Sequence, residues 1–513
     1  MSFVKSTVSL SDTKQFSKLI INYINGDESL RKFYSYTPHI ASFQQAIEDK
    51  SKESINRKVL VEALHKQYLQ SGIKDKSSTI NLLLSEKTFT VCTGHQLCLF
   101  TGPLYFIYKI ITTINLAEEL KKTYPTYEFV PVYWMASEDH DFEEISSINI
   151  FNKQITWNLP SAKGGVGRLS TESLAPLLDE LKLILGDTPN ATELIALFTN
   201  SYLGQKNLAD ATRVLVHHLF EAYPLIVLDA DDANLKNEFL HIMKDDIEHQ
   251  TNFSLVNQSI EALKKEGFSA QVNPREINVF RMSNDNRTRI ESSTEENLNL
   301  RDEEYSPNVV LRPLYQQKIL PNLAYVGGPG EIAYWLEYKA MFDHHRILFP
   351  VLIPRNFALM LEEKPMNQFY KLGFETKDLF KEIDELIKEF ITKITSDDIS
   401  LKLEEDKIMV TYQDIISKVT KIDTTLKGAV EAEMQKAINS FKLIESKLIK
   451  AEKQKQEINL NQLKKVKEKF FPTGNLQERH DNFIPFYLKS GKNLITDLKE
   501  TFNPFEFKMY LLE

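Results

Sequence analysis

Cysteine is scarce in this chain. Among 513 residues there are two, Cys92 and Cys98, and both lie in one apolar segment. A disulfide scaffold needs more cysteines, and neither a CxxC pair nor a metal-ligand spacing is present. The segment from Met1 to Leu19 also lacks the apolar core of a signal peptide. We therefore expect a cytoplasmic protein, with no resident metal site and no prosthetic group.

The chain has no surplus of basic residues. Lysine and arginine total 62 against 71 aspartates and glutamates, and the formal net charge is -9. The lysines are dispersed among glutamates rather than gathered on one face, which argues against a nucleic-acid partner. The hydrophobic fraction of 42% is typical of an ordinary folded protein. An anionic small-molecule substrate would therefore need a locally positive pocket.

No hydrophobic run has the uniformity of a membrane span. Residues 88–108 carry no formal charge and are long enough to cross a bilayer. However, Thr93-Gly94-His95-Gln96 and Thr101-Gly102-Pro103 would break a helix and leave polar groups unpaired in lipid. A strand, a loop and a helix N-terminus account for these residues, so we expect no membrane contact.

Apolar runs alternate with helical patterns from Thr88 onward. Continuous apolar runs bounded by turns are typical of parallel strands that are buried on both faces. The predicted strands are Phe89–Cys92, Phe129–Met135, Pro224–Leu228 and Ile347–Ile353, with a helix over Tyr105–Leu120 after the first of them. This pattern predicts an α/β fold with a doubly wound core.

The spacing of these runs also predicts the domain organisation. Amphipathic helices with polar joints precede the first strand, and polar, asparagine-rich stretches separate the later ones. We predict an N-terminal helical segment packed on the core (1–88), a core (89–365) with insertions near 142–223 and 250–322, a helical coiled-coil domain (366–470), and a C-terminal segment that packs back on the body (471–513).

Two long helical patterns follow the core, from Lys377 to Ile394 and from Lys421 to Phe470. The second carries an a/d heptad seam over roughly four heptads. Its members are Val430, Met434, Ala437, Phe441, Ile444, Leu448, Ala451 and Ile458. The seam fits a dimeric coiled coil, an antiparallel hairpin within one chain, or both together.

The turn Thr93-Gly94-His95-Gln96 directly follows a predicted buried strand. Ligands of open α/β sheets bind outside the carboxyl ends of the strands, where the next helix offers unpaired N–H groups. Gly94 would let a ligand approach the backbone, and His95 could donate to a phosphate oxygen or carry a proton. The alternative is a capped helix with a hydrogen-bonded, structural histidine.

An acidic stretch, Ser137 to Glu144, follows a second predicted strand. Its carboxylates could bind Mg²⁺ or an ammonium group, or act as acid and base. Glu143 and Glu144 suit a solvated helix start, where the helix dipole favours acidic residues. Asp139, His140 and Asp141 fit that alternative less well, because they directly follow the strand end.

Two further motifs suggest anion binding. The sequence Gly327-Gly328-Pro329-Gly330-Glu331 precedes a helix, and glycines at such an entrance permit close approach of an anion. It is neither a Walker A loop nor a GxGxxG fingerprint. Arg355, in Pro354-Arg355-Asn356 after the last strand, could complete an anion site. The alternatives are a structural turn and a surface salt bridge.

Several of these blocks, taken in order, resemble the bacillithiol biosynthesis cysteine-adding enzymes, the BshC family. The resemblance spans nearly the whole chain. It rests on residues 93–96 through 102–105, 134–144, Leu311-Arg312-Pro313, 324–334, and Phe471-Pro472-Thr473-Gly474-Asn475-Leu476-Gln477-Glu478-Arg479.

The resemblance implies a Rossmann-like core with two connective-peptide insertions and a coiled-coil domain that forms a homodimer. It also implies a ligase activity that joins the carboxyl group of L-cysteine to the amine of glucosaminyl malate, the last step of bacillithiol synthesis. The Thr-Gly-His turn is similar to the nucleotide-binding histidine motif of class I aminoacyl-tRNA synthetases. The second histidine of that motif is absent, because Leu97 and Cys98 occupy its place.

Amide formation from a free carboxylate is uphill in water, so we expect ATP or another nucleotide, with Mg²⁺ as a candidate cofactor. The hypothesis assigns His95 and Gln96 to the nucleotide or developing phosphate charge, and Asp139 or Asp141, beside His140, to deprotonation of the amine. Expected nucleotide- or substrate-binding residues are Thr93, Gly94, Thr101, Gly102, Trp134, Arg312, Gly327, Gly328, Gly330, Glu331, Arg355, Asn356, Gln477, Glu478 and Arg479.

Two other functions remain as alternatives. The first is a non-catalytic dimeric scaffold that binds a nucleotide and supports thiol biosynthesis. The second is a synthetase-like enzyme that acts on tRNA, against which the chain lacks a basic surface run.

Overall fold

The computed structural model describes residues 3–283, 286–394 and 400–513. Residues 1–2, 284–285 and 395–399, which belong to the predicted N-terminal segment, second insertion and helical domain, lie outside the described residues. The chain forms two compact units, one of Met1–Leu359 with Leu476–Glu513 and one of Met360–Asn475. Each unit is described by itself.

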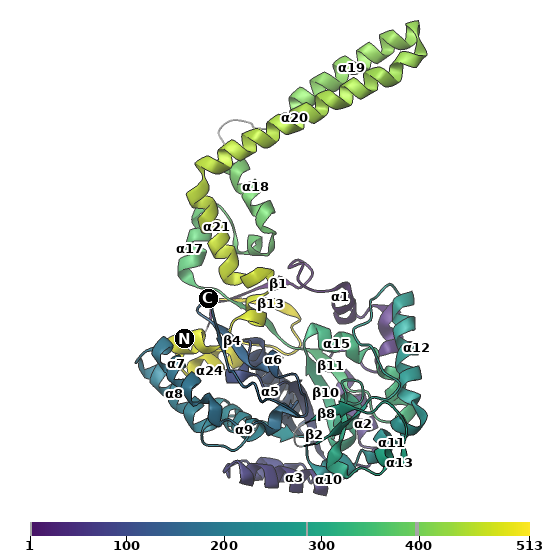
Figure 1. The fold of residues 1–513 in the computed structure, drawn as a ribbon, viewed down its shortest axis with the longest axis vertical. Helices are drawn as coiled ribbons and strands as arrows, with labels where there is room; N and C mark the ends of the chain where they lie inside the picture. Colours follow the sequence, from purple (N-terminus) through teal and green to yellow (C-terminus); the bar gives the residue numbers. More distant parts are fainter. Residues whose placement is uncertain (1–2, 284–285, 395–399) are drawn as a thin grey trace. The chain divides into compact units, whose positions relative to one another are not determined.

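The first unit is built around a five-stranded parallel sheet (Figure 1). The order β11-β10-β2-β3-β6 is the 3-2-1-4-5 order of a Rossmann half-sheet when the strands are renumbered along the chain. The α/β, Rossmann-like class predicted from the apolar runs is confirmed. The strands are β2 (Thr88–His95), β3 (Glu128–Met135), β6 (Ile226–Asp229), β10 (Asn322–Gly327) and β11 (Val351–Pro354).

The register brings the carboxyl ends of three strands together. In β2 and β3 the paired residues run from Thr88 and Glu128 to His95 and Met135. Strand β10 pairs with β2 on the other side and ends at Gly327. The strand order reverses between β2 and β10, where a ligand crevice is expected in this fold. Helix α5 (Tyr105–Thr123) follows β2 and is buried along most of its length.

The N-terminal segment is mostly helical, with α1 (Lys18–Ile24), α2 (Ser42–Lys50), α3 (Arg57–Gln70) and α4 (Ser77–Leu82). Its first element, however, is a strand, β1 (Lys5–Ser9), which pairs antiparallel with β13 (Lys508–Leu512) near the other end of the chain. The sequence did not reveal β1 because no residue of this strand is buried, so an apolar alternation is absent.

The chain between β3 and β6, and again between β6 and β10, carries the added elements. The first stretch contains α6 (Phe142–Ile145), the hairpin β4 (Ser147–Ile150) and β5 (Lys153–Thr156), α7 (Ala175–Leu185), α8 (Pro189–Tyr202) and α9 (Leu208–Leu219). The second contains α10 (Ala233–Asn237), α11 (Leu240–His249), α12 (Thr251–Lys265), α13 (Glu295–Leu298), α14 (Arg312–Ile319) and a three-stranded sheet of β7 (Val279–Met282), β8 (Arg287–Arg289) and β9 (Tyr305–Pro307).

The remaining elements of the first unit flank the sheet. Helices α15 (Pro329–Trp335) and α16 (Lys339–His345) connect β10 to β11, and β12 (Phe357–Met360) follows β11. After the second unit the chain returns with α22 (Gln477–His480), α23 (Ile484–Ser490) and α24 (Asn493–Thr501).

The second unit contains α17 (Glu363–Lys371), α18 (Ile383–Ile394), α19 (Lys402–Ile422), α20 (Lys427–Lys455) and α21 (Glu457–Phe470). The predicted helix from Lys377 begins only at Ile383, because Lys381 is extended after a 3₁₀ turn. The predicted helix from Lys421 is three segments, since the backbone leaves the helical region at Asp423 and Gln456. A short turn joins α19 to α20, which pack against each other (Figure 1).

The hairpin of α19 and α20 uses only part of the heptad seam. Val430, Met434, Ala437 and Phe441 are half-buried, whereas Ile444 and Leu448 are 48% and 41% exposed. The antiparallel hairpin that the heptad pattern allows is therefore present, and apolar side chains of α20 remain at its surface. Among the helices of the described ranges, none combines the length and the apolarity that a bilayer crossing demands.

Candidate active site

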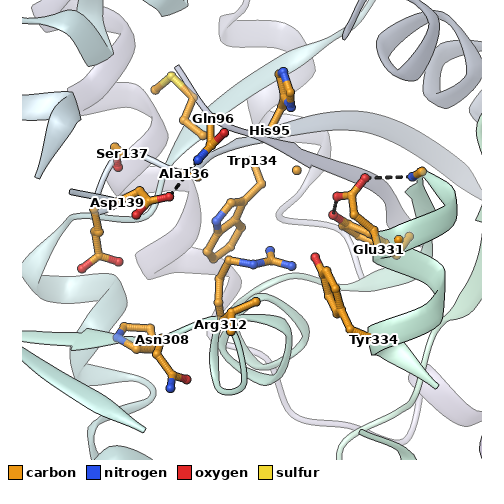
Figure 2. A pocket seen from close by; sticks show the side chains of 18 of the residues that line it. His95, Gln96, Trp134, Ala136, Ser137, Asp139, Asn308, Arg312, Glu331 and Tyr334 are labelled. Carbon is orange, nitrogen blue, oxygen red and sulfur yellow. Dashed lines mark hydrogen bonds between the residues drawn. The ribbon is translucent and has the colours of Figure 1, made fainter. Parts of the chain in front are cut away.

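A cavity of about 850 Å³ lies at the carboxyl ends of β2, β3 and β10 (Figure 2). Its volume is within the roughly 300–1,000 Å³ of small-molecule sites. The predicted site residues that line it are Gly94, His95, Gln96, Trp134, Asp139, Arg312, Gly328, Gly330, Glu331, Arg355 and Arg479. Motifs separated by more than two hundred residues meet here because parallel strands end at one edge of the sheet.

The cavity is positively charged although the chain is acidic. Its lining has seven cationic residues, Lys109, Arg275, Arg287, Arg289, Arg312, Arg355 and Arg479, and three carboxylates, Glu138, Asp139 and Glu331. The whole chain has the opposite balance, with 62 basic and 71 acidic residues. A concave site of one sign concentrates ligands of the opposite charge. The cavity therefore suits a substrate that carries carboxylates or phosphates.

A buried ion pair fixes the wall between β2 and β10. Lys109 of α5 donates to the carbonyl oxygen of Gly94 and to Oε2 of Glu331, 2.7 Å away. Glu331 also accepts from the Tyr325 hydroxyl at 2.5 Å and from the Gly328 amide at 2.8 Å. Burial raises the pKa of Glu331, but the charge of Lys109 and these hydrogen bonds together hold it below its usual value. Glu331 is therefore ionised, and its ion pair and hydrogen bonds hold this wall of the cavity in position.

Gly94 serves packing rather than open access for a ligand. A Cβ atom at this position would lie 3.1 Å from the Tyr325 hydroxyl and 3.6 Å from Nη1 of Arg312. The expected space above the glycine is therefore filled by two side chains of the site. Gly330 differs, because a Cβ atom added there would have no other atom within 4 Å, and the backbone at this position is open to an approaching group.

His95 is held neutral. Burial lowers its pKa to about 3, and the nearby charges of Lys109 and Arg355 act in the same direction. Its ring packs against Tyr105 and Phe106, with centroids 5.3 and 5.1 Å away. A histidine with this pKa is a poor proton acceptor near neutral pH. The low pKa argues against proton transfer, so donation of a hydrogen bond remains of the two roles that the sequence suggested; the ring Nε2 lies 3.8 Å from Sγ of Cys98.

Gln96 and Asp139 form a polar bridge between the ends of β2 and β3. The Gln96 amide donates to Asp139 Oδ2 at 3.0 Å and to Glu144 Oε2 at 2.6 Å. The other oxygen of Asp139 lies 3.8 Å from Nη1 of Arg287. Asp139 is partly exposed to the cavity (Figure 2), so it is placed to meet a ligand amine.

His140 and Asp141 do not share this position. After Asp139 the chain turns away to begin α6 at Phe142, and both side chains are outside the cavity lining. His140 is exposed and its Nδ1 lies 3.2 Å from Nη1 of Arg287. Of the three consecutive residues expected to carry catalysis, the fold therefore directs only Asp139 to the cavity.

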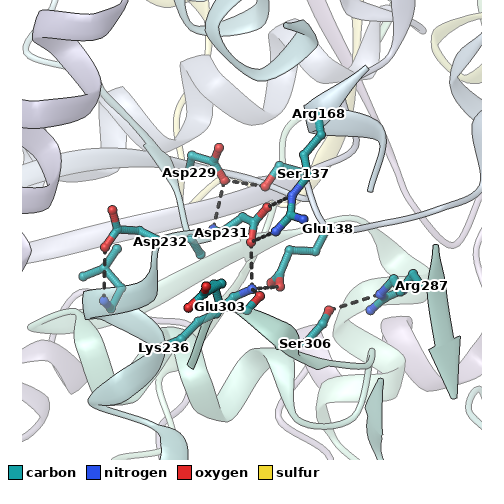
Figure 3. A network of polar contacts seen from close by, with 12 residues as sticks. Ser137, Glu138, Arg168, Asp229, Asp231, Asp232, Lys236, Arg287, Glu303 and Ser306 are labelled. Atoms are coloured by element: carbon teal, nitrogen blue, oxygen red, sulfur yellow. Dashed lines mark hydrogen bonds and ion pairs between the residues drawn. The ribbon is translucent and has the colours of Figure 1, made fainter. Parts of the chain in front are cut away.

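Glu138, the residue before Asp139, faces the cavity and a buried network at the same time (Figure 3). Its Oε1 lies 2.7 Å from Nζ of Lys236, which is also 2.7 Å from Oδ1 of Asp231. Arg168 holds Asp231 from the other side at 2.7 Å. Burial raises the pKa of Glu138 although Lys236 opposes the shift. The network fixes Glu138 beside Asp139.

Arg355 is a buried residue of the cavity wall, and two of its three guanidinium nitrogens have partners. Its Nη2 pairs with Glu478 at 2.6 Å, and its Nη1 donates to the Asn356 carbonyl. Its buried Nε has no hydrogen-bond partner among the described residues. Arg479 lies close enough that the charge of Arg355, after burial, lowers its pKa. Two neighbouring guanidinium groups that repel each other are a favourable place for an anion.

The remaining predicted residues support the site from outside its lining. Thr93 donates to the Val326 carbonyl at 2.8 Å and ties β2 to β10. Asn356 accepts a hydrogen bond from the Thr112 hydroxyl and donates one to the Asn503 carbonyl. Gly102 has a φ of 67°, and a Cβ there would lie 2.5 Å from that of Cys98. The others outside the lining are Thr101, Gly327, Gln477 and Glu478, all of them buried.

Sequence reasoning missed several lining residues, including Lys109, Arg275, Arg287 and Arg289, and it named Glu138 only as a member of the acidic stretch. Lys109 had a detectable signal, since it is a lone charge within the apolar run of α5, and buried lysines are rare unless paired. The three arginines had none. They lie in an insertion whose short strands do not form an apolar run.

The chain is similar to known families and proteins over nearly its whole length. Residues 5–356 match the model of the bacillithiol biosynthesis BshC N-terminal Rossmann-like domain, and residues 358–513 match that of the BshC C-terminal coiled-coil domain. A Flavobacterium psychrophilum protein named "Putative cysteine ligase BshC" is 43% identical over 97% of each chain. A protein of the same name from Flavobacterium johnsoniae is 42% identical over 98% of this chain and 99% of that relative. Another from Cytophaga hutchinsonii is 37% identical over 99% of each chain.

Two family models thus cover the chain almost from end to end. They meet close to Leu359, where the second unit begins, and the coiled-coil model also includes residues 476–513, which belong to the first unit. The match covers 97% and 99% of the two Flavobacterium relatives. The protein belongs to the BshC family of bacillithiol biosynthesis.

Proposed function

We propose that this protein is a cysteine ligase that joins the carboxyl group of L-cysteine to the amine of glucosaminyl malate and forms an amide. The observation that carries the proposal is the family match over nearly the whole chain, together with a cavity whose lining suits these reactants. Both substrates carry carboxylates, which the cationic surplus favours. The acceptor also carries an amine, for which Asp139 is a suitable partner.

The reaction needs the cysteine carboxylate to be activated, and we propose that a nucleotide does this. The carboxylate oxygen would attack a phosphorus atom and expel the rest of the nucleotide. The amine nitrogen would then attack the acyl carbon, lose its proton to Asp139 and release the phosphorylated or adenylated oxygen. Arg355, Arg479 and the neutral His95 would bind the phosphate charge, and Gln96 would hold Asp139 in place.

The residues around Arg355 fit a phosphate-bearing ligand, since the cavity is lined both by Arg355, whose buried Nε has no hydrogen-bond partner among the described residues, and by Gly330, whose backbone is open. For Mg²⁺ we assign no protein site. Across the described residues, no group of three or more histidine, cysteine, aspartate or glutamate side chains could hold a metal ion. Mg²⁺ is commonly held by one or two carboxylates together with substrate phosphates, so the nucleotide would supply part of its coordination.

The test is reconstitution with purified protein, L-cysteine, glucosaminyl malate and each of several nucleotides, with the product thiol measured by mass spectrometry. We expect formation of the amide with at least one nucleotide. The ligase assignment fails if no nucleotide supports it while cells that contain the protein make the thiol. The rival, a non-catalytic scaffold, predicts that a deletion strain is rescued equally by wild type and by Asp139→Asn. The ligase predicts no rescue by that variant.

We further propose that the protein is a cytoplasmic homodimer that uses the exposed apolar side chains of α20. Leu443, Ile444 and Leu448 are 59%, 48% and 41% exposed, which is unusual for three large apolar residues within six positions. Light scattering should give the mass of a dimer for wild type and of a monomer for Leu443→Glu combined with Leu448→Glu. Lys436→Glu, an exposed change on the same helix, is the matched control. A monomeric wild type would contradict the proposal.

A further inference from the structure

The β7–β8 hairpin presents one face to the cavity. In its antiparallel register Phe280 lies opposite Arg289, and Met282 opposite Arg287, so these four side chains share a face. Phe280, Arg287 and Arg289 all line the cavity. Arg281 points to the other face, where its Nη1 pairs with Glu296 at 2.6 Å. The hairpin therefore separates cavity-facing arginines from one that faces away.

Arg287 is the fixed member of this face. Its Nε donates to Ser306 Oγ at 3.1 Å and its Nη2 to the Pro307 carbonyl at 3.0 Å. Its guanidinium carbon is 4.2 Å from the centre of the Phe280 ring. With these contacts and its proximity to Asp139, Arg287 has little donor capacity left for a ligand.

Arg289 and Arg275 are different, because their guanidinium groups are exposed at the cavity and uncommitted. Within the described ranges neither group donates a hydrogen bond or forms an ion pair. Arg289 lies over the Phe280 ring, 5.4 Å from its centre. Two free guanidinium groups thus line the same cavity as the hairpin that contacts Asp139.

The loop that carries Arg275 is held firmly. The Arg275 amide donates to Asn278 Oδ1 at 3.3 Å, and Asn278 Nδ2 donates back to the Arg275 carbonyl at 2.8 Å. The buried carboxylate of Glu337 accepts from the amides of Gln271 and Val272 at 2.6 and 3.2 Å. Asp246 accepts from the Asn278 amide at 2.6 Å. Three buried polar groups therefore fix the backbone of the loop on both sides of Arg275, so only the side chain remains to be ordered when a ligand binds.

This arrangement sorts the charges of the cavity into two regions. Asp139 and Glu331 lie on opposite sides in Figure 2, with Trp134 and Arg312 between them. Arg355 belongs to the Glu331 side, since its charge lowers the pKa values of His95 and Lys109, and Arg479 lies close enough to Arg355 for the pKa of Arg479 to be lowered as well. The hairpin belongs to the Asp139 side through Arg287. A bifunctional acceptor with an amine and carboxylates matches the Asp139 side.

Resting on the proposed function, we infer that Arg275 and Arg289 bind the dicarboxylate end of the amine acceptor and so set its amine against Asp139. Each guanidinium offers a planar pair of donors that matches one carboxylate. The hairpin and the loop before it then determine which amines the enzyme accepts, while the Arg355 side takes the activating group.

The test compares two acceptors with wild type, Arg275→Gln, Arg289→Gln and the double variant. One acceptor is glucosaminyl malate, and the other is methyl glucosaminide, which has the amine but no dicarboxylate. We expect KM for glucosaminyl malate to rise roughly 10- to 100-fold for each arginine lost. The KM for cysteine and the slow rate with methyl glucosaminide should stay within twofold. Arg281→Gln, on the outer face of the same hairpin, should behave as wild type.

Calorimetric binding of glucosaminyl malate to the full-length protein separates this inference from the proposed function. Binding to wild type that is lost in the double variant supports the inference even where turnover is absent. Equal loss with both acceptors would reveal a merely structural role and overturn it. Unchanged binding of glucosaminyl malate to the double variant would also overturn the inference. The same holds if the KM for the nucleotide rises instead of the KM for glucosaminyl malate.

Discussion

Replacement of Lys109 with methionine removes the ammonium group that pairs with Glu331 inside the first unit. The lysine side chain is 2% exposed and that of Glu331 is 24% exposed, with 2.7 Å between Nζ and Oε2. Methionine has a similar length and fits an apolar helix, so the main effects are the loss of the charge and of the hydrogen bond to the Gly94 carbonyl. Glu331 would keep the Tyr325 and Gly328 donors but would remain an ion with its strongest partner gone.

The size of the effect follows from the cost of an unpaired buried charge. Removal of one partner of a buried pair costs about 3–5 kcal/mol. Glu331 retains two donors and some contact with water, so we expect the lower end, about 3 kcal/mol. The double variant Lys109→Met with Glu331→Gln should recover most of this loss, because no ion is then left without a partner.

The stability difference between wild type and the Lys109 variant should depend on pH. In wild type the folded pKa of Glu331 is below its unfolded value, so its contribution is present above the unfolded pKa and is lost as pH falls through the folded one. In the variant, burial raises the folded pKa of Glu331 above its unfolded value, because the opposing charge of Lys109 is gone. Protonation of Glu331 then stabilises the folded variant. The difference between the two proteins should therefore be larger at pH 7 than at pH 5.

Urea unfolding followed by tryptophan fluorescence measures the free energy of unfolding of the first unit, since Trp134, Trp157 and Trp335 all belong to it. Lys121→Met is the matched control. It lies on the same helix and pairs with Glu128 at 2.6 Å, but both side chains are more than 40% exposed, and such pairs contribute about 0–1 kcal/mol. A Lys109 variant no less stable than the control, or one that Glu331→Gln fails to rescue, would refute the reasoning.

Three further predictions concern the cavity. Asp139→Asn should lower kcat about 10²- to 10⁴-fold, as for loss of a general base, with a KM for cysteine near that of wild type; an unchanged kcat would remove Asp139 from the mechanism. His95→Ala should lower kcat/KM, yet the wild-type pH profile from 5.5 to 8 should show no step due to His95, because its pKa is about 3; a step lost in the variant would contradict this. Gly94→Ala should destabilise the protein by about 1–3 kcal/mol through contact with Tyr325, whereas Gly330→Ala should be neutral in stability, and equal effects in thermal unfolding would refute the packing role.

The sheet was predictable because its strands are buried on both faces. Phe89–Cys92 and Phe129–Met135 read as continuous apolar runs and became β2 and β3. An exposed edge strand such as β1 leaves no comparable trace. The predicted helix from Lys421 was too long, since it runs through Asp423 and Gln456, where the backbone is not helical.

The candidate site was predictable where polar residues follow a buried strand. His95, Asp139, Gly328 and Arg355 each do so, and topology alone brings them to one edge. Periodicity does not say which side chain of a turn faces inward, and so Asp139 could not be separated from Asp141. The arginines of the β7–β8 hairpin depend on a register and an insertion path that no local pattern encodes.

The most direct test of the central claim follows the carboxyl oxygen of cysteine. L-cysteine labelled with ¹⁸O in its carboxyl group is incubated with the purified protein, glucosaminyl malate and the effective nucleotide. We predict one amide for each nucleotide cleaved, with one ¹⁸O atom transferred to the released phosphate or nucleoside monophosphate. Amide without label transfer would contradict activation of the cysteine carboxyl by a nucleotide, and absence of the amide would contradict the ligase itself.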